Sequence, residues 1–439
     1  MKYMMPIWCS MLADPFIWRF YCFFQPGRFK KDFERKGFLK RAEAFLNKQE
    51  KLEQTPEKKG QIENPYKPGQ VLELDDSLFV GRHDLVRQLE VALGKGNHRQ
   101  IFFLNGERQM GKSSMLKQLP SLLGARYLPI VLPLQNRAIS SSTSALLGGI
   151  AEEIYKVMNF GGMPVRTLVH MSLREASEES DAAAYYIFDE WFRELEQTLE
   201  QNDRTLLLIF DDFEELEKAR QEGDLNLKLL LDWFRSTIQN RHRVTLLFSG
   251  VHTLGEMGIE TGINWAGYFV NVETLRVSFL RVNEVRQLIT KPIPDFPSEQ
   301  IFGAGVVEEI IQVTGCHPFL VESVCSVLIE NLNIEKRGRA EIQDVRVAMI
   351  QVLESRWSTY FRDLWERSNQ EQRACLINVN NLGNGDLQQI AQQSKMEESI
   401  TYRILQTLLR RGLVLREQGS YRIVAPIFSE WVERIADLY

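Results

Sequence analysis

The chain has 439 residues and a formal net charge of −5, with 44% hydrophobic and 25% charged residues. These values are ordinary for a globular protein, and they exclude a disordered chain, a collagen-like chain and a small disulfide scaffold. A net negative chain is also not a strongly basic nucleic-acid binder by bulk charge. The five cysteines are scattered without a C-x-x-C spacing, which argues against a zinc site and favours a reducing cytoplasm.

The N-terminal part differs in composition from the rest. The first 69 residues hold 14 Lys and Arg against 8 Asp and Glu, whereas the other 370 hold 39 against 50. Residues 47–70 are polar and contain several Pro and Gly, which is typical of a linker. The apolar stretch before it includes Asp14 and Arg19, so it does not read as a membrane-spanning helix. We expect residues 1–46 to be the remnant of a longer N-terminal region. They would dock on a partner protein or on a membrane surface, in a protein that is cytoplasmic or peripheral to the membrane.

Residues 71–280 alternate short apolar runs with amphipathic stretches. The runs predict strands at 100–104, 127–134, 205–210, 244–248 and 270–275. The amphipathic stretches predict helices at 84–93, 112–123, 142–158, 183–201 and 225–239. Strands that alternate with helices favour a parallel sheet covered on both faces, so the predicted fold class of this core is α/β.

Beyond residue 280 the spacing of apolar residues is helical. Helices are predicted at 283–290, 306–313, 318–332 and 341–353, and we assign residues 281–355 to a helical lid. The final part, 356–439, begins with helices and ends with two apolar runs around a Gln-Gly-Ser turn. Helices followed by a terminal hairpin predict a winged-helix domain.

Residues 106–113 have the pattern G-x-x-x-x-G-K-S of a phosphate-binding loop, between a predicted strand and a predicted helix. Its glycines allow a tight turn whose N–H groups surround an anion. Lys112 is expected to contact the β- and γ-phosphates, and the Ser113 hydroxyl to bind Mg²⁺. The predicted cofactors are therefore ATP or ADP with Mg²⁺. The predicted nucleotide contacts in this segment are Gly106, Glu107, Arg108, Gln109, Met110, Gly111, Lys112, Ser113 and Ser114.

An acidic pair follows the apolar run at 205–210. Asp211 is expected to hold Mg²⁺ through water, and Asp212 to orient or deprotonate the attacking water, with Glu214 or Glu215 as alternatives. Ser249, at the end of the next predicted strand, is a candidate sensor of the γ-phosphate. Together with the loop, these residues predict a P-loop NTPase that hydrolyses ATP with Mg²⁺.

From about Asn64 to Tyr439 the chain resembles the STAND class of AAA+-related P-loop ATPases. The motifs that carry the resemblance are N-P-Y at 64–66, F-V-G-R at 79–82, D-D at 211–212 and T-G-C-H-P-F-L at 314–320. The resemblance implies that Gly81 and Arg82 lie over the adenine and ribose and that Pro318 packs on the base. His317 would be either a ligand in the lid or a cap at the helix start. The paired aspartates imply slow hydrolysis, as in a switch rather than a motor.

The resemblance further implies a signalling or defence switch. ADP would hold the lid and the winged helix against the core, and ATP would release them and permit self-association. Two alternatives are an origin-recognition-like ATPase on DNA and an interaction module with a vestigial site. DNA binding is not favoured, because residues 357–439 hold ten basic and ten acidic residues and the expected recognition helix, 397–411, begins with two glutamates. Arg241 and Arg243 are expected to be surface charges rather than arginine fingers.

Overall fold

A computed structural model describes residues 61–94, 101–168, 170–261, 263–269, 271–355 and 357–436. The predicted docking segment 1–46 and most of the predicted linker 47–70 lie outside the described residues. None of the helices in the described ranges has both the length and the apolar character needed to cross a bilayer.

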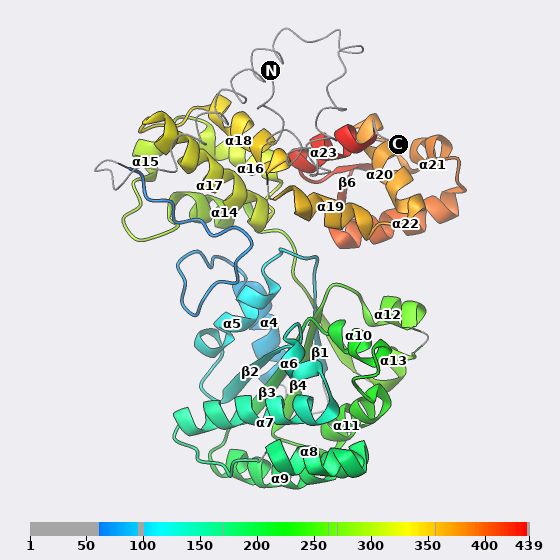
Figure 1. Cartoon of the computed structure of the whole chain (residues 1–439). Helices are drawn as coiled ribbons and strands as arrows, with labels where there is room; N and C mark the ends of the chain where they lie inside the picture. The colour runs from blue at the N-terminus through cyan, green and yellow to red at the C-terminus, as the bar shows by residue number, and fades with distance from the viewer. Residues whose placement is uncertain are drawn as a thin grey trace, which may run out of the picture. The chain divides into compact units, whose positions relative to one another are not determined.

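The core contains a five-stranded parallel sheet, as the alternation of apolar runs and helices predicts (Figure 1). The strands are β1 (Ile101–Asn105), β2 (Tyr127–Pro133), β3 (Thr205–Asp211), β4 (Val244–Gly250) and β5 (Val272–Arg276). Their order across the sheet is β2-β3-β4-β1-β5, with every neighbouring pair parallel. Strand β2 contains two prolines, which it tolerates because it lies at the edge of this sheet. The α/β fold class is therefore confirmed.

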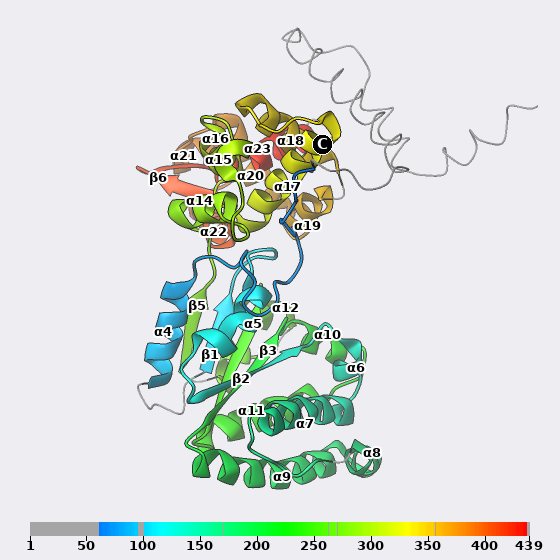
Figure 2. The same cartoon turned by 90° about the vertical axis from the view of Figure 1, so that its left-hand side faces the viewer.

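Side chains alternate between the two faces of the sheet, and each face has its own hydrophobic core. Along β1, Ile101 and Phe103 join one core, while Phe102 and Leu104 join the other. Helices α7 (Thr143–Phe160), α9 (Asp181–Gln201) and α11 (Leu227–Asn240) cover the first face. Helices α4 (His83–Gly94) and α5 (Lys112–Leu122) cover the second (Figure 2).

Five shorter helices connect these elements: α6 (Arg137–Ser140), α8 (His170–Glu179), α10 (Glu215–Gln221), α12 (Leu254–Thr261) and α13 (Trp265–Tyr268). Helix α8 lies where the sequence pattern predicts no element. It buries only Leu173 and Ala176, so its apolar periodicity is too sparse to stand out in the sequence.

The C-terminal helical region, residues 281–436, contains ten helices and one antiparallel hairpin among the described residues. Its elements are α14 (Val282–Thr290), α15 (Ser298–Ile301), α16 (Val306–Thr314), α17 (Pro318–Glu335), α18 (Ile342–Glu354), α19 (Ser358–Glu366), α20 (Gln370–Leu382), α21 (Leu387–Ser394), α22 (Glu398–Arg411), β6 (Val414–Glu417), β7 (Ser420–Ile423) and α23 (Pro426–Ala436).

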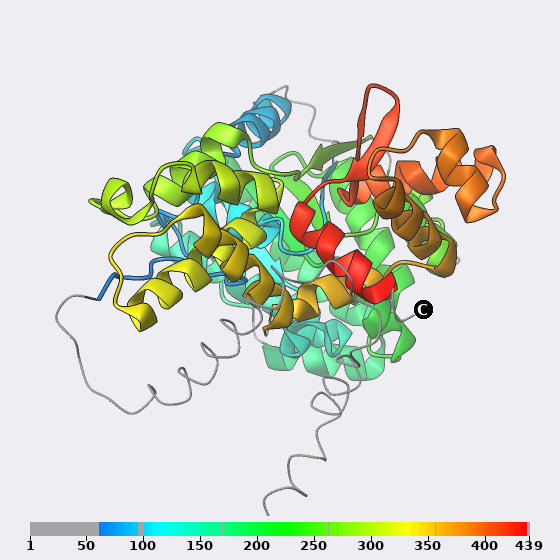
Figure 3. The same ribbon diagram turned by 90° about the horizontal axis from the view of Figure 1, so that it is seen from above.

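One hydrophobic core runs through the C-terminal helical region. It joins side chains of α14–α18 with those of α19–α23, so no break in packing marks residue 355. The last helix, α23 (red in Figure 3), packs against α16 and α18 as well as α20. The residues before α4 also enter this core through Tyr66, whose hydroxyl donates to the carbonyl of Ile289. The N-P-Y segment therefore packs on the C-terminal helical region.

Candidate functional site

The loop between β1 and α5 has the backbone that a phosphate-binding loop needs. Gln109 and Gly111 have positive φ angles of 62° and 83°, and Gly111 is the residue before α5. Gly106 approaches another strand so closely that a Cβ there would lie 2.8 Å from the Val277 carbonyl oxygen. The glycines of the motif are thus fixed by geometry, and the loop delivers free N–H groups at the start of an eleven-residue helix.

Lys112 is buried inside this loop. Its Nζ donates to the carbonyl oxygens of Gly106, at 2.7 Å, and Glu107, at 3.1 Å, and the residue is 7% exposed. Burial lowers the pKa of Lys112, and the negative charges of Glu214 and Asp211 oppose that shift. The amine is therefore held at the place where the loop would receive phosphate oxygens.

Asp211 ends strand β3 on the side of the phosphate loop, and Asp212 directly follows the strand. Leu207 and Ile209 face the α5 side of the sheet, so the period of two places Asp211 on that side as well. Burial raises the pKa of Asp212 to about 6, with contributions from the charges of Asp211 and Glu214. Three carboxylates near one lysine leave negative charge in surplus, although the described residues hold no group of three or more His, Cys, Asp or Glu arranged to bind a metal ion.

Ser249 and Glu214 flank the acidic pair in different ways. Ser249 lies on β4 beside Leu104 of β1, is fully buried, and its hydroxyl oxygen has no hydrogen-bond partner among the described residues. The Glu214 carboxylate instead accepts from the backbone N–H groups of Val251 and His252. It therefore holds the loop that follows β4, whereas Ser249 remains a donor available at the strand end.

The F-V-G-R segment contacts the phosphate loop through the side chain of Arg82. Arg82 is 6% exposed, and its guanidinium donates to the carbonyl oxygens of Met110, at 3.0 Å, and Ser278. Burial lowers the pKa of Arg82. Gly81 has a φ of 72°, and a Cβ there would lie 2.4 Å from the Glu284 carboxyl carbon. Arg82 thus connects the phosphate loop to the segment that follows β5, and Gly81 packs closely against Glu284 at the start of α14.

Pro318 is the first residue of α17, the place predicted from the G-C-H-P motif. His317 precedes it but makes no side-chain capping hydrogen bond, so the predicted capping role is wrong. Its Nε2 is instead 2.7 Å from the hydroxyl of Tyr360 on α19. Burial lowers the pKa of His317 to about 3, and Arg82 adds to that shift. The imidazole is therefore a neutral contact between α17 and α19.

Arg241 does not lie on the surface as expected. It is 7% exposed, pairs with Asp189 and Glu196, and stacks over Phe192. Arg243 pairs with Asp203 at 2.7 Å. The expectation of a surface charge is wrong for Arg241, because α9 supplies carboxylates beside the end of α11; both arginines serve the packing of these elements.

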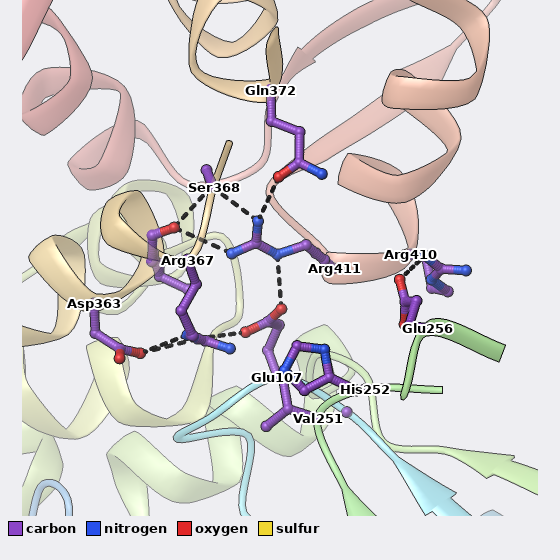
Figure 4. A network of polar contacts seen from close by, with 12 residues as sticks. Glu107, Val251, His252, Glu256, Asp363, Arg367, Ser368, Gln372, Arg410 and Arg411 are labelled. Atoms are coloured by element: carbon purple, nitrogen blue, oxygen red, sulfur yellow. Dashed lines mark hydrogen bonds and ion pairs between the residues drawn. The ribbon is translucent and has the colours of Figure 1, made fainter. Parts of the chain in front are cut away.

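Sequence reasoning missed two arginines that contact the phosphate loop from the C-terminal helical region. Arg411 donates through Nε to the Glu107 carboxylate at 2.9 Å, and Arg367 donates to its other oxygen at 2.7 Å (Figure 4). The sequence shows Arg410 and Arg411 as two basic residues at the end of a predicted helix. It does not indicate that either arginine pairs with a residue more than 250 positions away. Glu107 was predicted only as a member of the loop.

The AAA ATPase domain family matches residues 78–243. This match spans the phosphate loop, Lys112 and the acidic pair described above. This part of the chain is therefore similar to AAA ATPase domains. No curated protein matches the chain.

Several solved structures are similar to the chain. The Walker-type ATPase paby2304 of Pyrococcus abyssi has a TM-score of 0.54 at 16% identity, over 81% of this chain and 96% of its own. The Aeropyrum pernix ORC2 protein has a TM-score of 0.49 at 12% identity, over 81% and 92%. The Thermotoga maritima RuvB Holliday junction branch migration motor has a TM-score of 0.41 at 14% identity, over 80% and 95%. The first of these similarities supports the P-loop ATPase fold.

Proposed function

We propose that this chain is a STAND-type regulatory ATPase, which binds ATP with Mg²⁺, hydrolyses it slowly and acts as a switch in signalling or defence. The observation that carries the proposal is the buried Lys112 amine, which lies inside a complete phosphate loop and close to the carboxylates of Asp211 and Asp212. A vestigial loop has no reason to keep a lysine desolvated among carboxylates, because burial of that charge is costly.

The residues have distinct roles in this proposal. The N–H groups before α5 and Lys112 bind the phosphates, and Ser113 and Asp211 hold the metal. Asp212 orients or deprotonates the attacking water, and the Ser249 hydroxyl donates to the γ-phosphate. Bound Mg²⁺ supplies charge neutralisation for phosphoryl transfer. The Glu214 carboxylate positions the loop after β4, and is a less suitable base because two backbone N–H groups already engage it.

The regulatory part rests on the C-terminal helical region, in which we assign a lid to residues 281–355 and a winged helix to residues 356–439. We infer that it lies against the phosphate loop in the closed state and that its release permits self-association. Residues 1–46 would dock the cytoplasmic protein on a partner or on a membrane surface, in keeping with their basic and aromatic composition.

An origin-recognition-like role on DNA is the second candidate, and the geometry of α22 disfavours it. The two arginines at the end of this helix are occupied within the protein, Arg410 by Glu256 and Arg411 by Glu107. The other end begins with Glu397 and Glu398. Such a helix offers little unpaired positive charge to DNA phosphates.

Titration calorimetry with ATP tests the proposal. We expect Lys112→Ala to weaken ATP binding by roughly 10- to 100-fold, because a charge-assisted contact to phosphate is lost. Lys117→Ala is the matched control, since Lys117 lies further along α5 with its side chain 42% exposed and paired with Glu73. Equal ATP affinity in wild type and Lys112→Ala would contradict the proposal.

A further inference from the structure

Five side chains of alternating charge connect the phosphate loop to the C-terminal helical region, and Figure 4 labels four of them, Arg411, Glu107, Arg367 and Asp363. Their order is Arg411, Glu107, Arg367, Asp363 and Arg108, and we call this set the charge ladder. The successive nitrogen-to-oxygen distances are 2.9, 2.7, 2.9 and 3.2 Å. Two members belong to the phosphate loop and three to α19, the residue after it, and α22. Every step of the ladder joins opposite charges.

The centre of the ladder is buried. The side chain of Glu107 is 6% exposed, and those of Arg411 and Arg367 are 11% and 19% exposed. Burial by itself raises the pKa of Glu107, but the two guanidinium groups outweigh it and the net pKa is lowered. Solvent screens buried ion pairs less than exposed ones. The central pairs therefore hold the two regions together more firmly than surface ion pairs would.

Arg411 is also fixed on its own side of the interface. Its Nη1 donates to the Ser368 hydroxyl at 2.8 Å and its Nη2 to the Leu364 carbonyl at 3.1 Å. These bonds orient the guanidinium before it reaches Glu107. The guanidinium is thus preorganised to give Glu107 a single charge-assisted hydrogen bond through Nε, which favours a carboxylate over an uncharged group.

Further contacts hold the end of α22 on the ATPase domain. Arg276, the last residue of β5, donates to the carbonyl oxygens of Leu409, at 2.9 Å, and Arg410. Arg410 pairs with Glu256. Gly412 comes so close to Phe279 that a Cβ there would lie 2.9 Å from its ring. The helix end, rather than the whole helix, is therefore the point of attachment.

Glu107 connects this attachment to the phosphate site. Its carboxylate accepts from Arg411 and Arg367, while its backbone carbonyl accepts from the Lys112 amine at 3.1 Å. A phosphate group bound in the loop would compete with the backbone carbonyl of Glu107 for the Lys112 amine. It would also add negative charge near the Glu107 carboxylate. Both effects act on a single residue of the loop.

We propose that Glu107 is a latch that couples nucleotide binding to the docking of α22, and that a bound triphosphate weakens the latch. The inference rests on the proposed function, since it requires that the loop bind ATP. Phosphate oxygens compete with the Glu107 carboxylate for guanidinium groups, and a third phosphate competes more strongly than two. By thermodynamic reciprocity, weakening the latch raises the affinity for the triphosphate.

Hydrogen–deuterium exchange of the full-length protein tests the latch through the amides of α22. In Glu107→Gln the side chain keeps its shape but loses its charge, and we expect exchange in α22 to become about tenfold faster or more, because the buried Arg411 loses its counter-charge and Arg367 keeps only its pair with Asp363. Arg411→Lys keeps one positive charge but loses the planar guanidinium that bonds to Ser368 and Leu364. It should give a smaller increase in the exchange rate of α22. Glu417→Gln is the control, since it breaks an exposed pair with Arg422 in the hairpin and should leave α22 unchanged.

The nucleotide dependence is measured with ADP and with a non-hydrolysable ATP analogue. In the wild type, the analogue should speed exchange in α22 more than ADP does, and Glu107→Gln should remove this difference. If exchange in α22 is equal in wild type, Glu107→Gln and Arg411→Lys, the latch is wrong even though calorimetry detects ATP binding. If the variants loosen α22 but neither nucleotide binds to the wild type, the proposed function fails and the coupling fails with it, while the docking contact stands.

Discussion

Glu322 on α17 makes the stability of the C-terminal helical region depend on pH near neutrality. The residue is 9% exposed, and its carboxylate accepts from the backbone N–H of Lys67 at 3.1 Å. Burial raises the pKa of Glu322 to about 7; the Lys67 N–H opposes the shift and the charge of Asp76 adds to it. The segment before α4 is thus tied to the region by a carboxyl group that is easily protonated.

The sign of the effect follows from proton linkage. Between its ordinary pKa near 4.5 and the folded value near 7, Glu322 binds more protons in the folded state than in the unfolded state. Stability is therefore highest below this window and falls as pH rises through it. For a shift of this size, the free energy of unfolding should fall by about 2 to 3 kcal/mol between about pH 5 and pH 8.

Glu322→Gln should abolish this contribution, because an amide oxygen can still accept from Lys67 but does not titrate. Urea unfolding, followed by tryptophan fluorescence at about pH 5 and about pH 8, measures this pH-dependent part of the free energy of unfolding. Glu330→Gln, on the same helix, is the matched control and should keep the wild-type pH dependence; within the described ranges the Glu330 carboxylate accepts a hydrogen bond from the nearby Ser326 hydroxyl alone. If wild type and Glu322→Gln lose the same free energy over this window, the argument from burial of this carboxyl is wrong.

Two further predictions concern the nucleotide site. Gly81→Ala should lower the free energy of unfolding by about 1 to 3 kcal/mol, because it adds a clash with Glu284 to the strain of a positive φ. Gly162→Ala, which has the same φ of 72° but no atom within 4 Å of its Cβ, should cost only the strain, about 1 kcal/mol, and calorimetric melting separates the two. Asp212→Asn should slow ATP turnover by about 100-fold while Asp211 preserves the Mg²⁺ dependence of ATP binding; turnover at the wild-type rate would exclude Asp212 as the base.

The sequence alone predicted those features that depend on neighbouring residues. The phosphate loop is one contiguous segment, and its glycines occupy positions where the backbone has a positive φ or approaches another strand closely. Strands β1, β2, β3 and β4 each coincide with a short apolar run, because both faces of the sheet are covered there, whereas the edge strand β5 buries only Leu275. Asp211 could be placed beside the loop since parallel strands end at the same edge of a sheet.

Only the tertiary structure decided which distant side chains meet. Glu107 lies 260 residues before Arg367 and 304 before Arg411. In the sequence each of them reads as an ordinary charge on a loop or at a helix end. The buried Arg241 was misread for the same reason, since its partners belong to α9 rather than to α11, at whose C-terminus it lies. The spacing of apolar residues predicts which face of a helix or strand is buried. It does not predict which charged side chains pair across an interface, because only the fold brings residues that are distant in the sequence close together.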